Sequence, residues 1–151
     1  MFSRTIHHLI LLAALLVMGL SLSACYTTAQ VLFVQGQKEF QVGNYQGAAE
    51  KFQEAIQLDP KNTTIVRYWL GKALYELGDY KGTATAFREF LRLTQSDPGR
   101  YADERWDAMF YLEKSLKALG EELTEEDRKQ KEIIQKHPVG WGGETGGMMR
   151  D

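Results

Sequence analysis

The residue types that usually carry out catalysis are scarce in this chain of 151 residues. It contains one cysteine, Cys25, and three histidines, His7, His8 and His137. The sequence offers no Ser/His/Asp set, no paired histidines at metal-binding spacing and no glycine-rich phosphate loop. A single cysteine can form neither an intramolecular disulfide nor a cysteine-based zinc site. We therefore expect a protein that is not an enzyme and has no cofactor or metal. Catalysis by carboxylates alone, for instance on peptidoglycan, stays open as an alternative.

The position of Cys25 points to another chemistry, the attachment of lipid. Residues 9–22 carry no charge and follow a start in which Arg4 is the only charged side chain. A run of this length is too short for a membrane-spanning helix, which needs about 20 apolar residues, and is typical of a secretory signal. The stretch Leu22-Ser23-Ala24-Cys25 resembles the bacterial lipobox, in which the cysteine is acylated and the chain is cleaved before it.

This resemblance implies a cleaved signal peptide over 1–24, acyl chains such as palmitate on Cys25, and a lipidated tether over 25–28. In the lipobox pattern an aspartate after the cysteine retains the protein in the inner membrane. Tyr26 stands there instead, which implies a lipid anchor in the outer membrane and a domain facing the periplasm. The alternatives are a chance thiol in a signal peptide or a slowly cleaved secretory signal.

The charge of the remaining chain argues against nucleic acid as a partner. Residues 25–151 contain 17 Lys and Arg against 20 Asp and Glu, because Arg4 is the only charge of the first 24 residues. The net charge of −3 provides no electrostatic attraction to a polyanion.

The elements of the domain follow from an internal repeat. Gly43-Asn44-Tyr45 corresponds to Gly78-Asp79-Tyr80 at a spacing of 35 residues, and each proline follows such a glycine by about half a repeat. Apolar residues recur at helical spacing over 48–58 and over 64–77, where the expected stripe is Val66, Leu70, Leu74 and Leu77. The order predicted is helix, glycine turn, helix, proline loop.

This pattern resembles the tetratricopeptide repeat (TPR). The shared positions are Gly36, Ala48, Phe52, Ala55 and Pro60 in the first copy and Leu70, Gly71, Tyr80 and Phe87 in the second. Thr83 and Phe90 depart from the family pattern, and Pro98 comes two residues late. The resemblance implies an all-α fold, a short TPR-type superhelix of about two and a half hairpins, with repeats over 29–62 and 64–97.

The third repeat, over 98–137, is degenerate. Asp97-Pro98 is expected to open a long helix that ends at Gly120, with one apolar face made of Trp106, Met109, Leu112, Leu116 and Leu119. A polar helix then starts at Thr124, where Asp127 completes a capping box. We expect this helix to cap the array, the alternative being a loosely held solvated helix. Five glycines in 138–151 predict a flexible tail.

In TPR proteins the first helix of each hairpin lines a groove that binds a partner. Carried over to this sequence, the groove positions fall on Phe33, Gln37, Phe40, Tyr68, Lys72, Tyr75, Phe110 and Lys114. Rings and lysines suit an extended or helical peptide with apolar anchors and an acidic group. The alternative is that the rings fill the space between hairpins. Phe33 and Phe110 fit both interpretations equally, whereas the hydroxyls of Tyr68 and Tyr75 favour the groove.

The groove lacks the residues of the clamp with which chaperone-binding repeats hold a terminal carboxylate. Phe33, Gln37, Trp69, Asp107 and Tyr111 occupy the places where that clamp needs lysine, asparagine or arginine. The function expected is that of an adaptor or assembly factor that binds an envelope protein, and the sequence does not choose among secretin, pilus, barrel-assembly or Tol–Pal systems. A structural homo-oligomer is the alternative.

Overall fold

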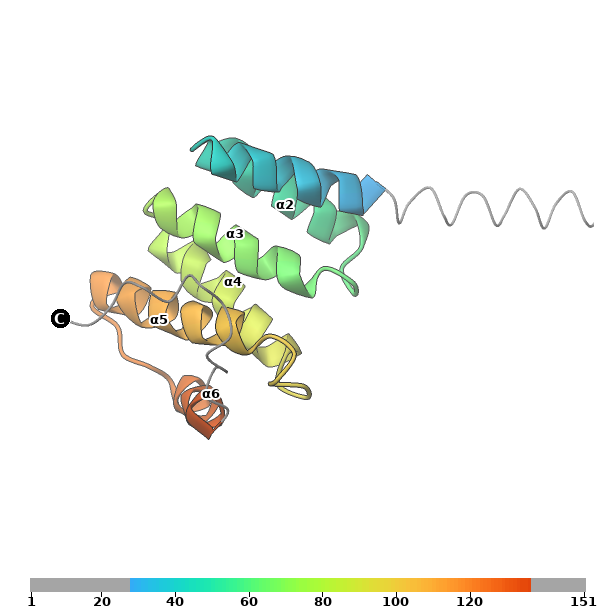
Figure 1. The fold of residues 1–151 in the computed structure, drawn as a ribbon. Helices are drawn as coiled ribbons and strands as arrows, with labels where there is room; N and C mark the ends of the chain where they lie inside the picture. Colours follow the sequence, from blue (N-terminus) through green and yellow to red (C-terminus); the bar gives the residue numbers. More distant parts are fainter. Residues whose placement is uncertain (1–27, 137–151) are drawn as a thin grey trace, which may run out of the picture.

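A computed structural model describes residues 28–136, and every regular element in that range is a helix (Figure 1). The first helix covers residues 28–41. It is followed by α2 (Tyr45–Leu58), α3 (Thr64–Glu76), α4 (Tyr80–Leu93), α5 (Ala102–Leu119) and α6 (Glu125–Lys136). The expected all-α fold is confirmed. The signal peptide, Cys25, His137 and the glycine-rich tail lie outside the described residues.

Three glycines make the tight turns inside the hairpins. Gly43, Gly78 and Gly120 have φ angles of +79°, +77° and +72°, which glycine adopts without the steric cost that a side chain would add. After two of these turns a polar side chain caps the next helix. Asn44 accepts a hydrogen bond from the Gly47 amide, and Asp79 accepts one from the Gly82 amide. The spacing of 35 residues thus repeats both the turn and its cap.

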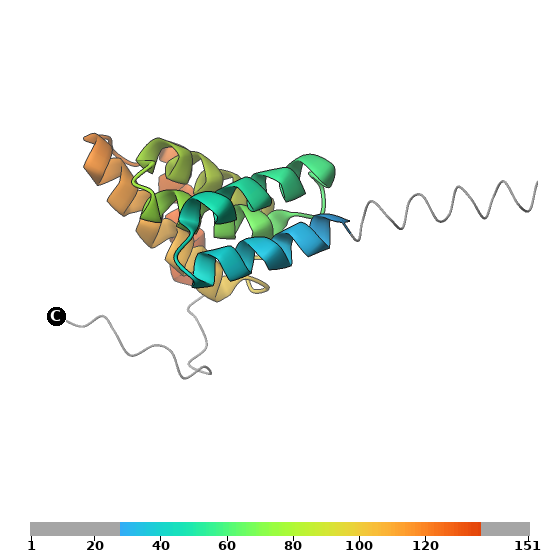
Figure 2. The same ribbon diagram turned by 90° about the horizontal axis from the view of Figure 1, so that it is seen from above.

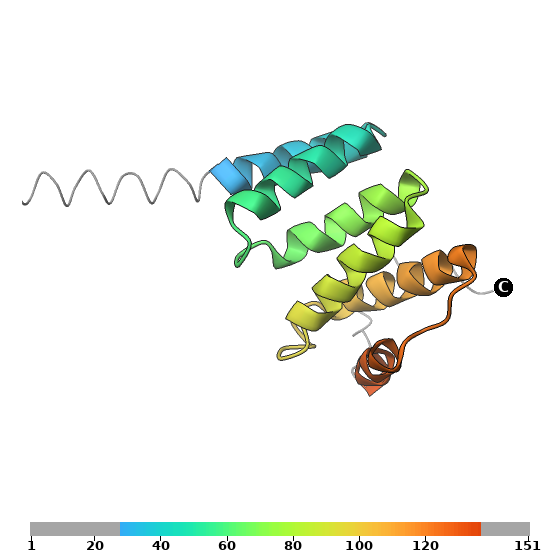
Figure 3. The ribbon, with the colours of Figure 1, turned by 180° about the vertical axis from the view of Figure 1, so that it is seen from behind.

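The helices stack as hairpins in two layers. The first helix, α3 and α5 form one layer, seen in front in Figure 1, and α2 and α4 form the other, seen in front in Figure 3. Close approach inside the first hairpin relies on small residues. Ala48 and Ala55 are fully buried, and a Cβ added to Gly36 would lie 2.5 Å from the Phe52 ring. Gly71 and Phe87 repeat this contact in the second hairpin, at 2.8 Å.

The start of α5 corrects one prediction. The helix begins at Ala102 and not at Pro98, because residues 98–101 form turns. The Asp97 amide donates to the Thr94 carbonyl and the Arg100 amide donates to the Asp97 carbonyl, both at 3.3 Å. Asp97 therefore continues the end of α4 and does not cap the next helix.

The buried face of α5 also differs from the predicted one. Met109, Leu112 and Leu116 are buried as expected, but Trp106 and Leu119 are each 39% exposed. The helix is rotated so that small residues, Ala108 and Ser115, and the long side chain of Arg105 face the interior instead. In α3, Leu77 is likewise 42% exposed because the helix ends at Glu76.

Arg105 joins three helices through its buried guanidinium. Its Nη1 donates to the Leu91 carbonyl at 3.1 Å and to Thr94 Oγ1 at 2.6 Å, and its Nη2 donates to Gln130 Oε1 at 3.1 Å. Burial lowers the pKa of Arg105. Hydrogen bonds to neutral oxygens offset part of the cost of removing this cation from water.

The last helix covers one end of the stack, as predicted. It is seen end-on in Figures 1 and 3, so it lies across the direction of α5. Ile134 is buried against the α5 side of the core. The capping box is present: the Thr124 amide donates to Asp127 Oδ2 at 2.9 Å, and the Asp127 amide donates to Thr124 Oγ1 at 3.2 Å. Asp127 also forms an ion pair with Arg88 of α4, at 2.8 Å. These bonds attach α6 to the rest of the array, so it is not a loosely held solvated helix.

Within residues 28–136, none of the helices has the length and apolar character needed to cross a membrane.

Candidate functional site

The predicted groove residues lie on the layer made by the first helix, α3 and α5. We call the outward side of this layer the groove face (Figure 1). Its helices are adjacent, since α3 packs against α5 and against the first hairpin.

At the centre, Tyr68 of α3 is bonded to Asp107 of α5. The hydroxyl donates to Asp107 Oδ2 at 2.6 Å, and the Tyr68 ring packs near Phe87 and Phe90 in the core. Only 7% of Tyr68 is exposed. Burial, followed by the hydrogen bond to the carboxylate, raises the pKa of the Tyr68 hydroxyl. The polar partner that its hydroxyl needs is supplied inside the chain, so Tyr68 fills the space between hairpins.

Lys72 extends the same cluster towards the surface. Its ammonium lies 3.3 Å from Asp107 Oδ2, and its side chain is 23% exposed. Three rings surround it, with centroids 5.4 Å (Tyr68), 5.7 Å (Trp69) and 5.8 Å (Tyr111) away. The carboxylate compensates the charge of this lysine, so it is poorly placed to attract an acidic partner.

Aromatic rings continue the cluster along α3 and α5. Tyr75 meets Tyr111 edge-on with centroids 4.7 Å apart, and Tyr111 stacks on Phe87 at 6.0 Å. Tyr75 and Tyr111 are half-buried. Both therefore belong partly to the hairpin interface and present only part of each ring to the groove face.

Phe110 and Lys114 form the most accessible part of the predicted set. The Lys114 ammonium lies 4.4 Å from the Phe110 ring centroid, a distance typical of a cation–π contact. Lys114 is the only exposed residue of the predicted set, and Phe110 beside it is half-buried. No carboxylate of residues 28–136 forms an ion pair with Lys114, so its positive charge remains available to a ligand.

The first helix contributes further aromatic rings, which join the central cluster through Trp69. Phe40 lies between Tyr45 and Trp69, with ring centroids 5.2 and 5.5 Å away, and Phe33 packs on Phe52 at 6.0 Å. Both phenylalanines and Gln37 are half-buried. The structure thus brings the predicted residues to one layer but uses many of their ring atoms for packing.

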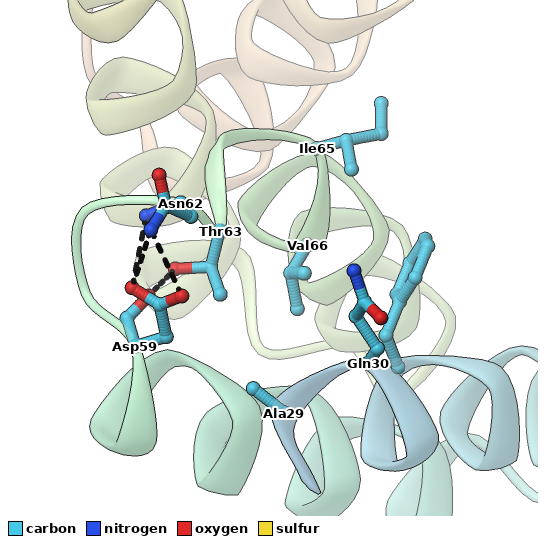
Figure 4. A pocket seen from close by; sticks show the side chains of 8 residues that line it. Ala29, Gln30, Asp59, Asn62, Thr63, Ile65 and Val66 are labelled. Carbon is cyan, nitrogen blue, oxygen red and sulfur yellow. Dashed lines mark hydrogen bonds between the residues drawn. The ribbon is translucent and has the colours of Figure 1, made fainter. Parts of the chain in front are cut away.

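A pocket of about 230 Å³ opens beside Phe33 (Figure 4). Ala29 and Gln30 line it from the first helix, and Ile65 and Val66 line it from α3. The side of the pocket at the α2–α3 loop is polar. There Asn62 Nδ2 donates to both carboxylate oxygens of Asp59, at 3.1 and 3.0 Å. It offers room for one apolar side chain of a bound peptide.

The residue that sequence reasoning missed is Asp107. The repeat pattern placed it at a groove position, but only to show that a carboxylate clamp was absent. Asp107 neutralises Lys72 only because α5 packs against α3. The sequence pattern of a single helix carries no information about that packing. Trp69 and Tyr111 were missed for the same reason.

The described residues offer little for catalysis or metal binding. Residues 28–136 contain neither histidine nor cysteine, and no group of three acidic side chains in that range is arranged to hold a metal ion. The predicted groove residues themselves are aromatic rings, one amide and two ammonium groups, of which Lys72 is paired with Asp107.

Two comparisons with known proteins bear on this face. Residues 36–78 match the family profile of the TPR repeat. These residues run from the close contact at Gly36, through α2 and α3, to the turn at Gly78. A search of curated proteins found no match. With the helix stacking above, the match assigns the fold to a TPR-type all-α superhelix and supports a TPR protein, whose repeats are typically protein–protein interaction modules.

Proposed function

We propose that this protein is a lipid-anchored adaptor of the bacterial envelope. In this proposal acyl chains on Cys25 hold the domain at the periplasmic side of the outer membrane. The groove face binds a segment of a partner envelope protein. The lipobox-like stretch before Cys25 supports the anchor, and the TPR match supports the binding module.

The observation that carries the binding proposal is the pair formed by Phe110 and Lys114. A half-buried ring beside an exposed, uncompensated cation suits a peptide that places an apolar side chain next to an acidic one. Lys72 does not contribute to this preference because Asp107 already pairs with it. We therefore place the acidic group of the partner over α5 and its apolar anchors towards Tyr75 and Phe33.

The anchor and the binding face are tested separately, with the full chain in its own host. Cys25→Ser is expected to abolish incorporation of labelled palmitate and to leave the precursor uncleaved. Normal labelling of this variant would refute the anchor.

Chemical cross-linking followed by purification then tests the face. The variant Phe110→Ala/Lys114→Glu is expected to lose a partner that the wild type captures, while far-ultraviolet circular dichroism stays unchanged. Gln57→Ala, an exposed residue of α2 in the other layer, is the control. If the double variant keeps the partner, the face is wrongly assigned. If light scattering shows that the captured protein is a second copy, the structural homo-oligomer is correct instead.

A further inference from the structure

The first helix has one side that no other described element covers. Val31 and Val34 of this helix are 53% and 48% exposed, and Val42, in the turn that directly follows it, is 78% exposed. They recur at helical spacing together with Gln35 and Lys38, which are also exposed. Figure 2 looks down on this hairpin, and among residues 28–136 nothing lies above it. We call this surface the end face.

The repeat shows what such a side normally does. A shift of 35 residues takes Val31, Val34 and Lys38 to Val66, Trp69 and Ala73 of α3. Val66 and Ala73 are buried in the core of the preceding hairpin, and Trp69 packs against it. The same side of α5 is buried at Ala108 and Ser115. Each later hairpin therefore uses the surface equivalent to the end face to pack on the hairpin before it. The first hairpin carries valines on this surface, although no described element packs against them.

The two ends of the array differ in polarity. At the other end, α6 buries Ile134 and exposes charged residues such as Glu125 and Glu132. The end face instead carries three valines and one cation. Glu39, the one acidic residue of the first helix among the described residues, is half-buried and accepts a hydrogen bond from Asn44 Nδ2 at 2.8 Å. An apolar surface with a lysine at its middle lacks the polar character expected of a cap in water.

The chain before the first helix suggests what covers this surface, provided that Cys25 is acylated as proposed above. The helix is already formed at residue 28, three residues after Cys25. Three extended residues span about 10 Å, so the acyl chains keep the helix next to the lipid headgroups. Apolar side chains can then enter the headgroup–acyl boundary while a lysine reaches lipid phosphates.

We propose that the end face lies on the surface of the membrane that holds the Cys25 acyl chains. Phe33 and Phe40 of the same helix pack inwards against the first hairpin, so the valines are the apolar side chains that face the lipid. A second copy is a poorer occupant. A two-fold contact centred on this face would place the two Lys38 side chains opposite each other.

The test uses the full lipidated chain, reconstituted in vesicles of phosphatidylethanolamine and phosphatidylglycerol. Cys25 is blocked by its acyl chain, so a nitroxide can be attached to one new cysteine, V34C. The matched control is L119C, which replaces another exposed aliphatic residue at the far end of α5. Electron paramagnetic resonance then measures how accessible each label is to oxygen, which partitions into lipid, and to a water-soluble nickel complex.

The proposal predicts that the V34C label is more accessible to oxygen and less accessible to the nickel complex than a label in water. The L119C label is expected to show the accessibilities of a label in water. An aqueous profile at both sites would overturn it. Shielding of the V34C label from both reagents, with spin–spin broadening, would also overturn it and would identify a second copy. Mass spectrometry of the peptide containing Cys25 separates the two proposals. An acylated chain with an aqueous V34C label refutes the end-face proposal alone, whereas an unacylated chain refutes the anchor as well.

Discussion

The hydroxyl of Tyr68 in α3 donates to the carboxylate of Asp107 in α5 across a distance of 2.6 Å, and so links two consecutive hairpins. The bond sits between the core and the groove face. It satisfies a buried hydroxyl on one side and positions a carboxylate beside Lys72 on the other. One contact thus affects both the stability of the stack and the charge that a partner would meet.

Removing the Tyr68 ring should destabilise the domain. Tyr68→Ala deletes a ring that packs in the core, and we expect the free energy of unfolding to fall by about 3–5 kcal/mol. Tyr68→Phe keeps the ring but loses the bond to Asp107, with an expected loss of about 1–3 kcal/mol. Urea unfolding followed by circular dichroism measures both. A Tyr68→Ala variant as stable as the wild type would show that the ring belongs to the binding face.

Overpacking at Ala48 tests the repeat register. Ala48 is fully buried in the first hairpin, so Ala48→Leu should destabilise the domain by roughly 1–3 kcal/mol. The control is Ala118→Leu, an exposed site on α5 where the larger side chain extends into water. Thermal unfolding compares the two. Equal melting temperatures for the Ala48→Leu variant and the wild type would mean that the first hairpin packs in another register.

Asp127 should make stability depend on pH in the acid range. Burial opposes ionisation of this carboxyl, but hydrogen bonds from Arg88 and Thr124 outweigh it and lower the pKa of Asp127. A lowered folded pKa stabilises the protein above the ordinary value of about 4 and loses this effect as the pH falls through the folded value.

Asp127→Asn should therefore cost about 1–3 kcal/mol at pH 7 and progressively less below pH ~4. Urea unfolding at a series of pH values measures the difference from the wild type, and Glu132→Gln, an exposed site on the same helix, serves as the control. A difference that stays constant down to the lowest pH would assign the effect to packing and not to charge.

The regular parts of the fold were predictable because local chemistry repeats there. A glycine followed by a capping residue at a spacing of 35 located two turns, and the apolar spacing located α2 and α3. The capping box at Thr124 and Asp127 is also a local signal. Such features involve residues within one turn of each other, so a sequence pattern contains all the partners.

The missed features each depend on contacts between hairpins. In an isolated helix, Arg105 would be expected to extend into water. In the structure it is buried, because α4 and α6 supply oxygen acceptors to it. Its burial accompanies the rotation that exposes Trp106. Tyr68 was assigned to the groove for its hydroxyl, because the partner on α5 could not be seen from α3 alone. The burial and bonding of these residues depend on partners that are distant in the sequence. A periodic pattern does not identify such partners.

The short tether gives a further prediction for the living cell. A Gly/Ser linker of about 20 residues inserted after Tyr26 would by itself have a root-mean-square end-to-end distance of roughly 25 Å. If the first helix must lie at the membrane, this variant should lose function while palmitate labelling and folding remain normal. A substitution series inside the linker, from flexible to Pro-rich, would show whether length alone is responsible. Full function with the long linker would show that proximity to the membrane is incidental.

The central claim is that the groove face binds a partner protein in the envelope, and photocross-linking at Phe110 tests it most directly. Benzoyl-phenylalanine at position 110 keeps a ring at this half-buried site beside Lys114, and the same group at position 57 on α2 reports on the opposite layer. After irradiation of living cells, we predict one discrete adduct from position 110, none from position 57, and loss of the adduct when Lys114→Glu is added. No adduct from position 110, or equal adducts from both positions, would contradict the claim.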